Sequence, residues 1–156
     1  MKNILILVAL MSATSMHSIA QGSIQKIPPV LNHYYNIKNA LVVGDSEAAS
    51  SNALLFLKLI NTVVYKIISE GNIHILAKDA GRITENKDIK KQRAWFANLS
   101  LNMISVAKAV KLNEQPVYIS YCPMKKTYWM TNDKEIRNPY YGSNMLTCGE
   151  ITDTIK

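Results

Sequence analysis

The sequence predicts a mainly α protein: an antiparallel up-down-up-down four-helix bundle with a turn-rich C-terminal cap. Apolar residues recur every three to four positions in four successive segments between residues 30 and 110, which is the spacing of amphipathic helices. The connections between these segments are about two to five residues long, and loops this short make neighbouring helices antiparallel. After Pro116 the apolar period shortens to two and turn-forming residues become frequent, which marks the start of the cap.

The first twenty residues (1–20) are expected to be a secretory signal peptide and not part of the fold. A basic start at Lys2 precedes the apolar run 4–11, and Ser-Ile-Ala at 18–20 fits a small-x-small cleavage site. The run is shorter than the roughly 20 apolar residues that span a membrane. We therefore expect an exported mature chain, residues 21–156, that forms a single domain without an integral membrane segment.

The charge of the chain points to a solvated basic surface. Lys and Arg number 18 against 11 Asp and Glu, a net charge of +7, and removal of the leader with its one lysine leaves 17 − 11 = +6. The basic residues form no run longer than two, and aromatic residues do not interleave with them. These features predict no nucleic-acid partner.

The first helix is expected over residues 30–43, where Gly44 ends it and Asp45 is placed to cap the next helix. The second helix is expected to continue for about five turns to Ile67, with Gly71 as its C-terminal stop. Its apolar stripe consists of Ala49, Ala53, Phe56, Ile60, Val63 and Ile67.

The third and fourth helices are expected to begin after the N-caps Asn72 and Asp88. The third is interrupted by Thr-Glu-Asn at 84–86. Its apolar stripe is Ile73, Leu76, Ala80 and Ile83, and that of the fourth is Ile89, Phe96, Leu99, Met103, Val106 and Val110.

The cap covers residues 116–150 and begins with alternating residues. Residues 117–122 read as a short strand, and residues 127–131 are placed to return as its hairpin partner across the Cys-Pro-Met-Lys-Lys loop. Asn-Pro at 138–139 and Gly142 then mark turns. We expect an irregular cap with one short β-hairpin.

Sulfur is concentrated in this cap. Cys122 and Met124 form one pair of soft donors, and Met145 and Cys148 form a second. Thiolates and thioethers select soft ions such as monovalent copper, so a copper(I) site is one interpretation. The four-cysteine spacing of a structural zinc site is absent from the sequence. In an oxidising compartment a Cys122–Cys148 disulfide is an equal alternative, and a redox-switchable combination of disulfide and metal site is a third.

The histidines of the mature chain are His33 and His74. Each lies near the start of an odd-numbered helix, and in an antiparallel bundle both starts lie at the end where the fourth helix finishes. Because the cap begins at that end, a mixed His/Cys/Met site is expected to be geometrically allowed. Capping or exposed roles for the two histidines are the commoner alternative.

Catalysis has little support in the sequence. It contains no nucleophile elbow, no phosphate-cradling glycine loop and no paired-histidine motif, and its carboxylates are scattered. A cysteine nucleophile with a histidine base is the enzymatic alternative. We expect a non-enzymatic domain.

Several motifs resemble one known family. They are Tyr118-x-x-Tyr-Cys122-Pro-Met124, Tyr128-Trp129, Glu135-Ile-Arg-Asn138-Pro-Tyr-Tyr-Gly142, Met145-Leu-Thr-Cys148-Gly-Glu150, Tyr35-Asn-Ile-Lys38-Asn-Ala-Leu-Val42 with Asp45 and Ala48, and Gln92-Arg93 followed by Phe96 and Leu99-Ser100. Together they resemble the family known as domain of unknown function 3347. The sequence departs from the usual family pattern after Cys-Pro-Met, where Lys-Lys-Thr (125–127) replaces an alanine and a glycine-containing stretch.

The resemblance implies an envelope protein of Gram-negative bacteria. Domains of this family also occur at the C-terminus of periplasmic adaptor subunits of heavy-metal efflux pumps, so the resemblance favours the metal interpretation and an envelope or efflux-system partner. The sequence therefore predicts a periplasmic, non-enzymatic domain that binds copper(I) and serves metal homeostasis or efflux. The alternative is a structural or interaction module with a Cys122–Cys148 disulfide and no metal.

Overall fold

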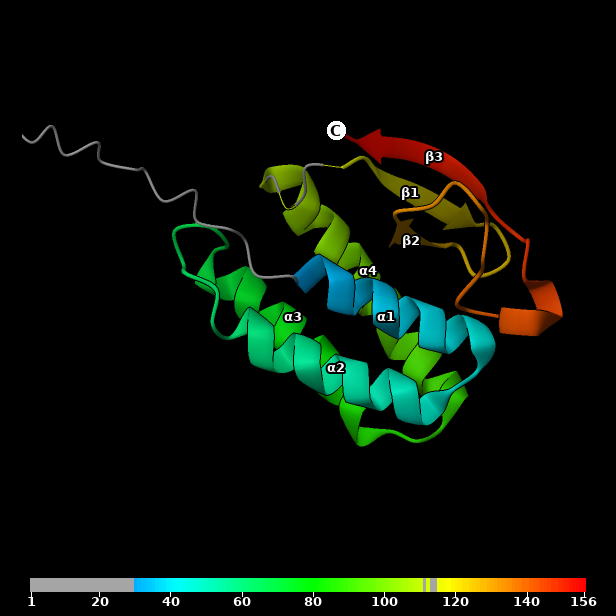
Figure 1. The fold of residues 1–156 in the computed structure, drawn as a ribbon, viewed down its shortest axis with the longest axis horizontal. Coiled ribbons are helices and arrows are strands. Elements are labelled where there is room, and N and C mark those ends of the chain that lie inside the picture. Colours follow the sequence, from blue (N-terminus) through cyan, green and yellow to red (C-terminus); the bar gives the residue numbers. More distant parts are fainter. Residues whose placement is uncertain (1–29, 111, 113–114) are drawn as a thin grey trace, which may run out of the picture.

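Four helices follow one another along the chain, and a small antiparallel sheet completes the fold (Figure 1). The computed structural model describes residues 30–110, 112 and 115–156, so the expected signal peptide lies outside the described residues. The elements are α1 (Val30–Val43), α2 (Ser46–Ile60), α3 (Glu70–Glu85), α4 (Ile89–Ala109), β1 (Val117–Cys122), β2 (Thr127–Thr131), the 3₁₀ helix η1 (Gly142–Met145) and β3 (Glu150–Ile155). Four sequentially packed helices with a C-terminal cap confirm the predicted mainly α fold class.

Local capping explains where most of the helices begin. α1 has the predicted bounds, and Asp45 caps α2 by accepting a 2.9 Å hydrogen bond from the Ala48 N–H. Asp88 caps α4 in the same way, by accepting a 2.8 Å bond from the Lys90 N–H. A side-chain oxygen at this position satisfies a backbone donor that the first helical turn leaves without a partner.

The second helix is shorter than predicted, because α2 ends at Ile60. Thr62 and the residues after it form turns, and the Thr62 hydroxyl donates to the Leu59 carbonyl at 2.7 Å. Such a side-chain bond competes with the helix backbone, and the β-branched residues that follow are poor helix formers. α3 begins at Glu70 with Ser69 as its N-cap, so Gly71 lies in its first turn and does not stop α2.

The sheet contains the predicted hairpin and one more strand. β1 lies in the centre, with β2 and β3 antiparallel on its two sides. β3 was not predicted from the sequence. Its Ile-Thr-Asp-Thr-Ile run (151–155) is rich in β-branched residues, a signal for a strand.

The cap is anchored on α1 and α4, and the sheet lies on the side of these helices away from α3 (Figure 1). The ring of Tyr34 on α1 stacks on Phe96 of α4, with 5.2 Å between ring centroids. Its hydroxyl accepts a 2.9 Å bond from the Met130 N–H of β2 and lies 2.8 Å from the Ser100 hydroxyl of α4. One buried tyrosine thus joins two helices and the sheet.

A glycine allows the cap to meet the C-terminal end of α1. Gly142 has φ +56°, and a Cβ at this position would lie 2.8 Å from the Val42 carbonyl oxygen. Arg93 of α4 donates to the neighbouring Leu41 carbonyl at 2.8 Å. The segment that leads to Cys148 is therefore held at the end of α1 that is remote from His33.

Candidate functional site

The two cysteines lie together at one end of the sheet. Cys122 is the last residue of β1 and is fully buried, and Cys148 is half-buried just before β3. Pairing of β1 with β3 places Tyr121 opposite Glu150, so the strands carry the two cysteines to the same edge. Both are thiols, and that of Cys148 lies within hydrogen-bonding reach of that of Cys122. The structure therefore brings together the two residues on which the sequence hypotheses depend.

The sulfur of Cys122 is surrounded by hydrogen-bond donors. The Asn138 side-chain amide donates to Cys122 Sγ at 3.2 Å, and the Lys125 backbone N–H donates at 3.4 Å. Sulfur is a weak acceptor as a neutral thiol, and bonds to it strengthen when it is ionised. Two N–H donors are thus directed at the buried Cys122 sulfur, one from a side chain and one from the backbone.

Asn138 organises the site, although the sequence marked it only as a turn former and as part of a family motif. Its side-chain amide also donates to the Cys148 carbonyl at 2.7 Å, and its side-chain oxygen accepts a 2.8 Å bond from the Tyr140 N–H. Its own backbone N–H donates to the Leu146 carbonyl at 2.7 Å, and Asn138 is fully buried. One side chain therefore fixes the segments that carry both cysteines.

The surroundings of the Cys148 thiol disfavour its ionised form. Desolvation raises the pKa of the Cys148 thiol, and the adjacent Cys122 raises it further, whereas the backbone of Met124 lowers it. Because Cys122 lies within hydrogen-bonding reach of Cys148, one ionised thiol beside another is unfavourable there. A cation between them would relieve this repulsion.

Two methionines with exposed side chains flank the sulfur pair, which is the pair of cysteine sulfurs of Cys122 and Cys148. Met124 is 60% exposed and Met145 is 38% exposed. Their backbones lie next to Cys148, since Met124 lies within hydrogen-bonding reach of its thiol and the Cys148 N–H donates to the Met145 carbonyl at 3.1 Å. The backbones of both methionines thus lie beside Cys148, and their side chains are open to solvent.

The histidines do not join this site. His33 is half-buried on α1 and His74 is exposed on α3. Within the described ranges no three His, Cys, Asp or Glu side chains are grouped so that they could share an ion. The predicted proximity of the cap to the two histidines is not observed, because β1 runs back along the bundle. Its end lies with the C-terminal end of α1, nine residues or about 14 Å along the helix from His33.

Gly149 allows the chain at Cys148 to come close to Cys122. Its φ is +149°, and a Cβ there would lie 2.6 Å from the ring of Trp129 and 2.9 Å from the Tyr121 carbonyl oxygen. Trp129 is fully buried and cannot retreat without disturbing the core. Only glycine therefore fits where the chain passes over Trp129 between Cys148 and β3.

Gly149→Ala is expected to lower the free energy of unfolding by about 1–3 kcal/mol, because overpacking and backbone strain add. Gly81→Ala on α3 is the matched control, since a Cβ there meets nothing within 4 Å. In a helix that change should stabilise by up to about 1 kcal/mol. Urea denaturation measures both, and equal effects of the two substitutions would contradict the assigned close approach.

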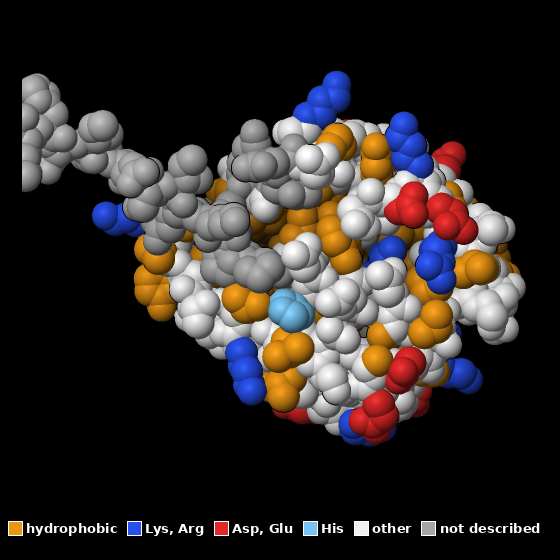
Figure 2. Space-filling view, in the orientation of Figure 1, with side chains coloured by type: hydrophobic (Ala, Val, Ile, Leu, Met, Phe, Trp, Pro, Cys, Tyr) orange, Lys and Arg blue, Asp and Glu red, His pale blue; other side chains and the backbone are white. Residues whose placement is uncertain are grey.

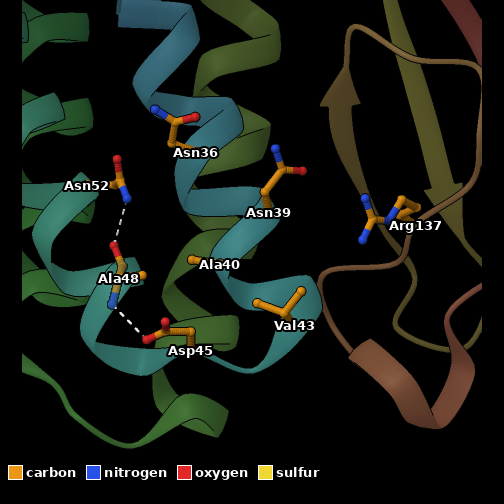
Figure 3. A pocket seen from close by; sticks show the side chains of 8 residues that line it. All are labelled: Asn36, Asn39, Ala40, Val43, Asp45, Ala48, Asn52 and Arg137. Carbon is orange, nitrogen blue, oxygen red and sulfur yellow. Dashed lines mark hydrogen bonds between the residues drawn. The ribbon is translucent and has the colours of Figure 1, made fainter.

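A separate polar pocket of about 440 Å³ lies between α1 and α2 (Figure 3). The amides of Asn36 and Asn39 on α1 and of Asn52 on α2 line it, and Arg137 faces them from the cap. None of the six sequence-predicted site residues lines this pocket.

The surface agrees with the expected solvated charge. On the face drawn in Figure 2, basic and acidic side chains are interspersed and do not form a patch of one sign. Among the helices of the described residues, none is both long and apolar enough to cross a bilayer.

A family comparison assigns the helical part of the chain. The family model described as "Protein of unknown function (DUF3347)" matches residues 30–115. These residues comprise α1 to α4, and the sulfur pair follows them in the cap. No curated protein and no solved structure shows significant similarity to the chain. Because the match covers more than half of its length, the chain belongs to the DUF3347 family.

Proposed function

We propose that this protein is a periplasmic, non-enzymatic domain that binds a soft monovalent metal ion through Cys122 and Cys148. Copper(I) is the preferred candidate for this ion. The observation that carries the proposal is the sulfur pair itself: two adjacent thiols, one of them fully buried and already accepting N–H donors. The family that the helical part matches also occurs, as the resemblance implies, at the C-terminus of heavy-metal efflux adaptors, and this adds an envelope context. An envelope or efflux-system component is the partner class that this context supports.

The donor set favours copper(I) over zinc. Thiolates select both ions, but a structural zinc site uses four protein ligands in a closed tetrahedron. In the part of the chain that the structure describes, two cysteines come together without a third His, Cys, Asp or Glu ligand. A small number of soft sulfur ligands is enough to bind monovalent copper, and Met124 and Met145 flank the two cysteines as candidates for further thioether donors.

The environment of Cys122 supplies outer support for a bound ion. Asn138 and the Lys125 N–H orient Cys122 Sγ, as hydrogen-bonding partners of metal ligands commonly do. Both thiols release protons on binding, so acidification should weaken the affinity.

The test is a thermal-unfolding experiment with copper(I) under reducing, anaerobic conditions. Copper at about a hundred times its Kd should stabilise the wild type by about 2.7 kcal/mol and raise the melting temperature by about 5–10 °C. Cys122→Ser/Cys148→Ser should show no shift, whereas Met124→Leu/Met145→Leu should keep a reduced shift. An absent shift for the wild type, or an equal one for the double cysteine variant, would overturn the proposal.

The second candidate is an interaction module in which the same cysteines form a disulfide. It is favoured by the adjacency of the thiols and by the oxidising compartment that a signal peptide implies. Intact mass of the protein as isolated from the periplasm distinguishes the candidates. A loss of two hydrogen atoms that reductant restores supports the disulfide, and a fully reduced chain contradicts it.

A further inference from the structure

The geometry points to a reversible dithiol–disulfide couple in which Cys148 exchanges with external disulfides and Cys122 resolves the mixed disulfide. The substrate class is a thiol-oxidant disulfide, either a small molecule or a partner protein. This inference uses the two sulfurs of the proposed metal site but requires no ion to bind. It assigns different chemical roles to Cys122 and Cys148, which the sequence alone does not distinguish.

Exposure decides which sulfur meets the external disulfide. Cys148 is half-buried at the edge of the sheet, whereas Cys122 has no exposed surface. Exchange requires a sulfur to approach the disulfide directly, so its rate depends on access as well as on the thiolate fraction, which the raised pKa of Cys148 lowers. Cys148 is the one that solvent-borne disulfides can reach.

Hydrogen bonding determines the role of the second sulfur. Asn138 and the Lys125 N–H both donate to Cys122 Sγ, and Asn138 at the same time holds the Cys148 carbonyl. The two donors hold the Cys122 sulfur in position when it leaves during reduction, and Asn138, which contacts both cysteines, keeps it beside Cys148 during oxidation. Cys122 is thus held as an internal nucleophile and leaving group.

The exchange balances in two steps. Cys148 Sγ attacks one sulfur of the external disulfide and loses its proton to solvent. The external S–S bond breaks, and the first thiolate departs. Cys122 Sγ, deprotonated in turn, then attacks Cys148 Sγ and the second external thiolate departs. The protein pair is oxidised by two electrons, and the external disulfide is reduced to two thiols.

The test uses the metal-free, reduced chain with oxidised glutathione, acid quenching and intact mass. The wild type should lose two hydrogen atoms without accumulating an adduct. Cys122→Ser should stop at one stable glutathione adduct on Cys148. Cys148→Ser should form its adduct at no more than about one tenth of the rate of Cys122→Ser, since its remaining sulfur is buried. Peptide mapping of the wild type at the earliest times, which depends on no variant, should find glutathione on Cys148.

Several results would overturn the assignment: equal adduct rates for the two single variants, early glutathione on Cys122, or two adducts on the wild type. Failure of the metal proposal gives a different result. A chain that binds no copper under reductant but shows the predicted adduct pattern removes only the metal site. A chain that binds copper while both variants react alike removes only the exchange roles.

Discussion

Replacing Asn138 with alanine is expected to lower the free energy of unfolding by about 2–4 kcal/mol. The substitution leaves the Cys148 carbonyl and the Tyr140 N–H without their partner inside the cap, and Cys122 Sγ loses one of its donors. Buried groups without partners are costly, since water cannot replace the lost bonds. Urea denaturation measures the loss, and thiol-reagent kinetics should show faster modification of Cys122.

Asn144→Ala is the matched control for this prediction. Asn144 lies in η1 of the same cap but is exposed, so the change should stay within about 0.5 kcal/mol. If Asn138→Ala is as mild as this control, then Asn138 does not organise the sulfur pair.

Lys38→Met is expected to stabilise the protein at pH 7 by up to about 3 kcal/mol. Lys38 is 4% exposed, and its Nζ has a single long hydrogen bond, 3.4 Å to the Thr131 hydroxyl. Desolvation, and then repulsion from Arg137, lowers the pKa of Lys38 to about 8, against attraction from Asp133 and Glu135. The folded state therefore disfavours the charged amine, and methionine fills a similar volume without charge.

The dependence on pH identifies this cause. Between pH 8 and an unfolded pKa near 10.5, the unfolded chain binds more protons at Lys38 than the folded one, so wild-type stability gains from this group as pH rises. The advantage of Lys38→Met should consequently be full below pH 8 and disappear by about pH 10.5. Chemical denaturation at several pH values measures it.

Lys58→Met, at an exposed lysine, should change stability by less than about 0.5 kcal/mol at any pH. A pH-independent advantage for Lys38→Met would contradict the assignment.

The helical part of the fold was predictable because each helix buries one stripe of apolar side chains. The end of α2 was not predictable, since Val63 and Ile68 remain buried although their backbone has left the helix. Apolar spacing reports burial and not backbone conformation. β3 escaped prediction for the opposite reason: its residues are largely exposed, so no alternation of apolar and polar positions marks it.

The candidate site was predictable as a set of sulfurs but not as an arrangement. The proximity of Cys122 and Cys148 depends on the pairing of β1 with β3, which no local pattern encodes. The role of Asn138 depends on contacts ten and sixteen positions away along the chain. The separation of His33 from the sulfurs follows from the direction of β1, which sequence spacing leaves open.

X-ray absorption at the copper edge tests the central claim most directly. Reduced wild-type protein loaded with one equivalent of copper(I) should show a first coordination shell of sulfur alone, and Cys122→Ser/Cys148→Ser should retain no stoichiometric copper. A first shell of nitrogen or oxygen in the wild type, or unchanged copper retention by the double variant, would contradict the account.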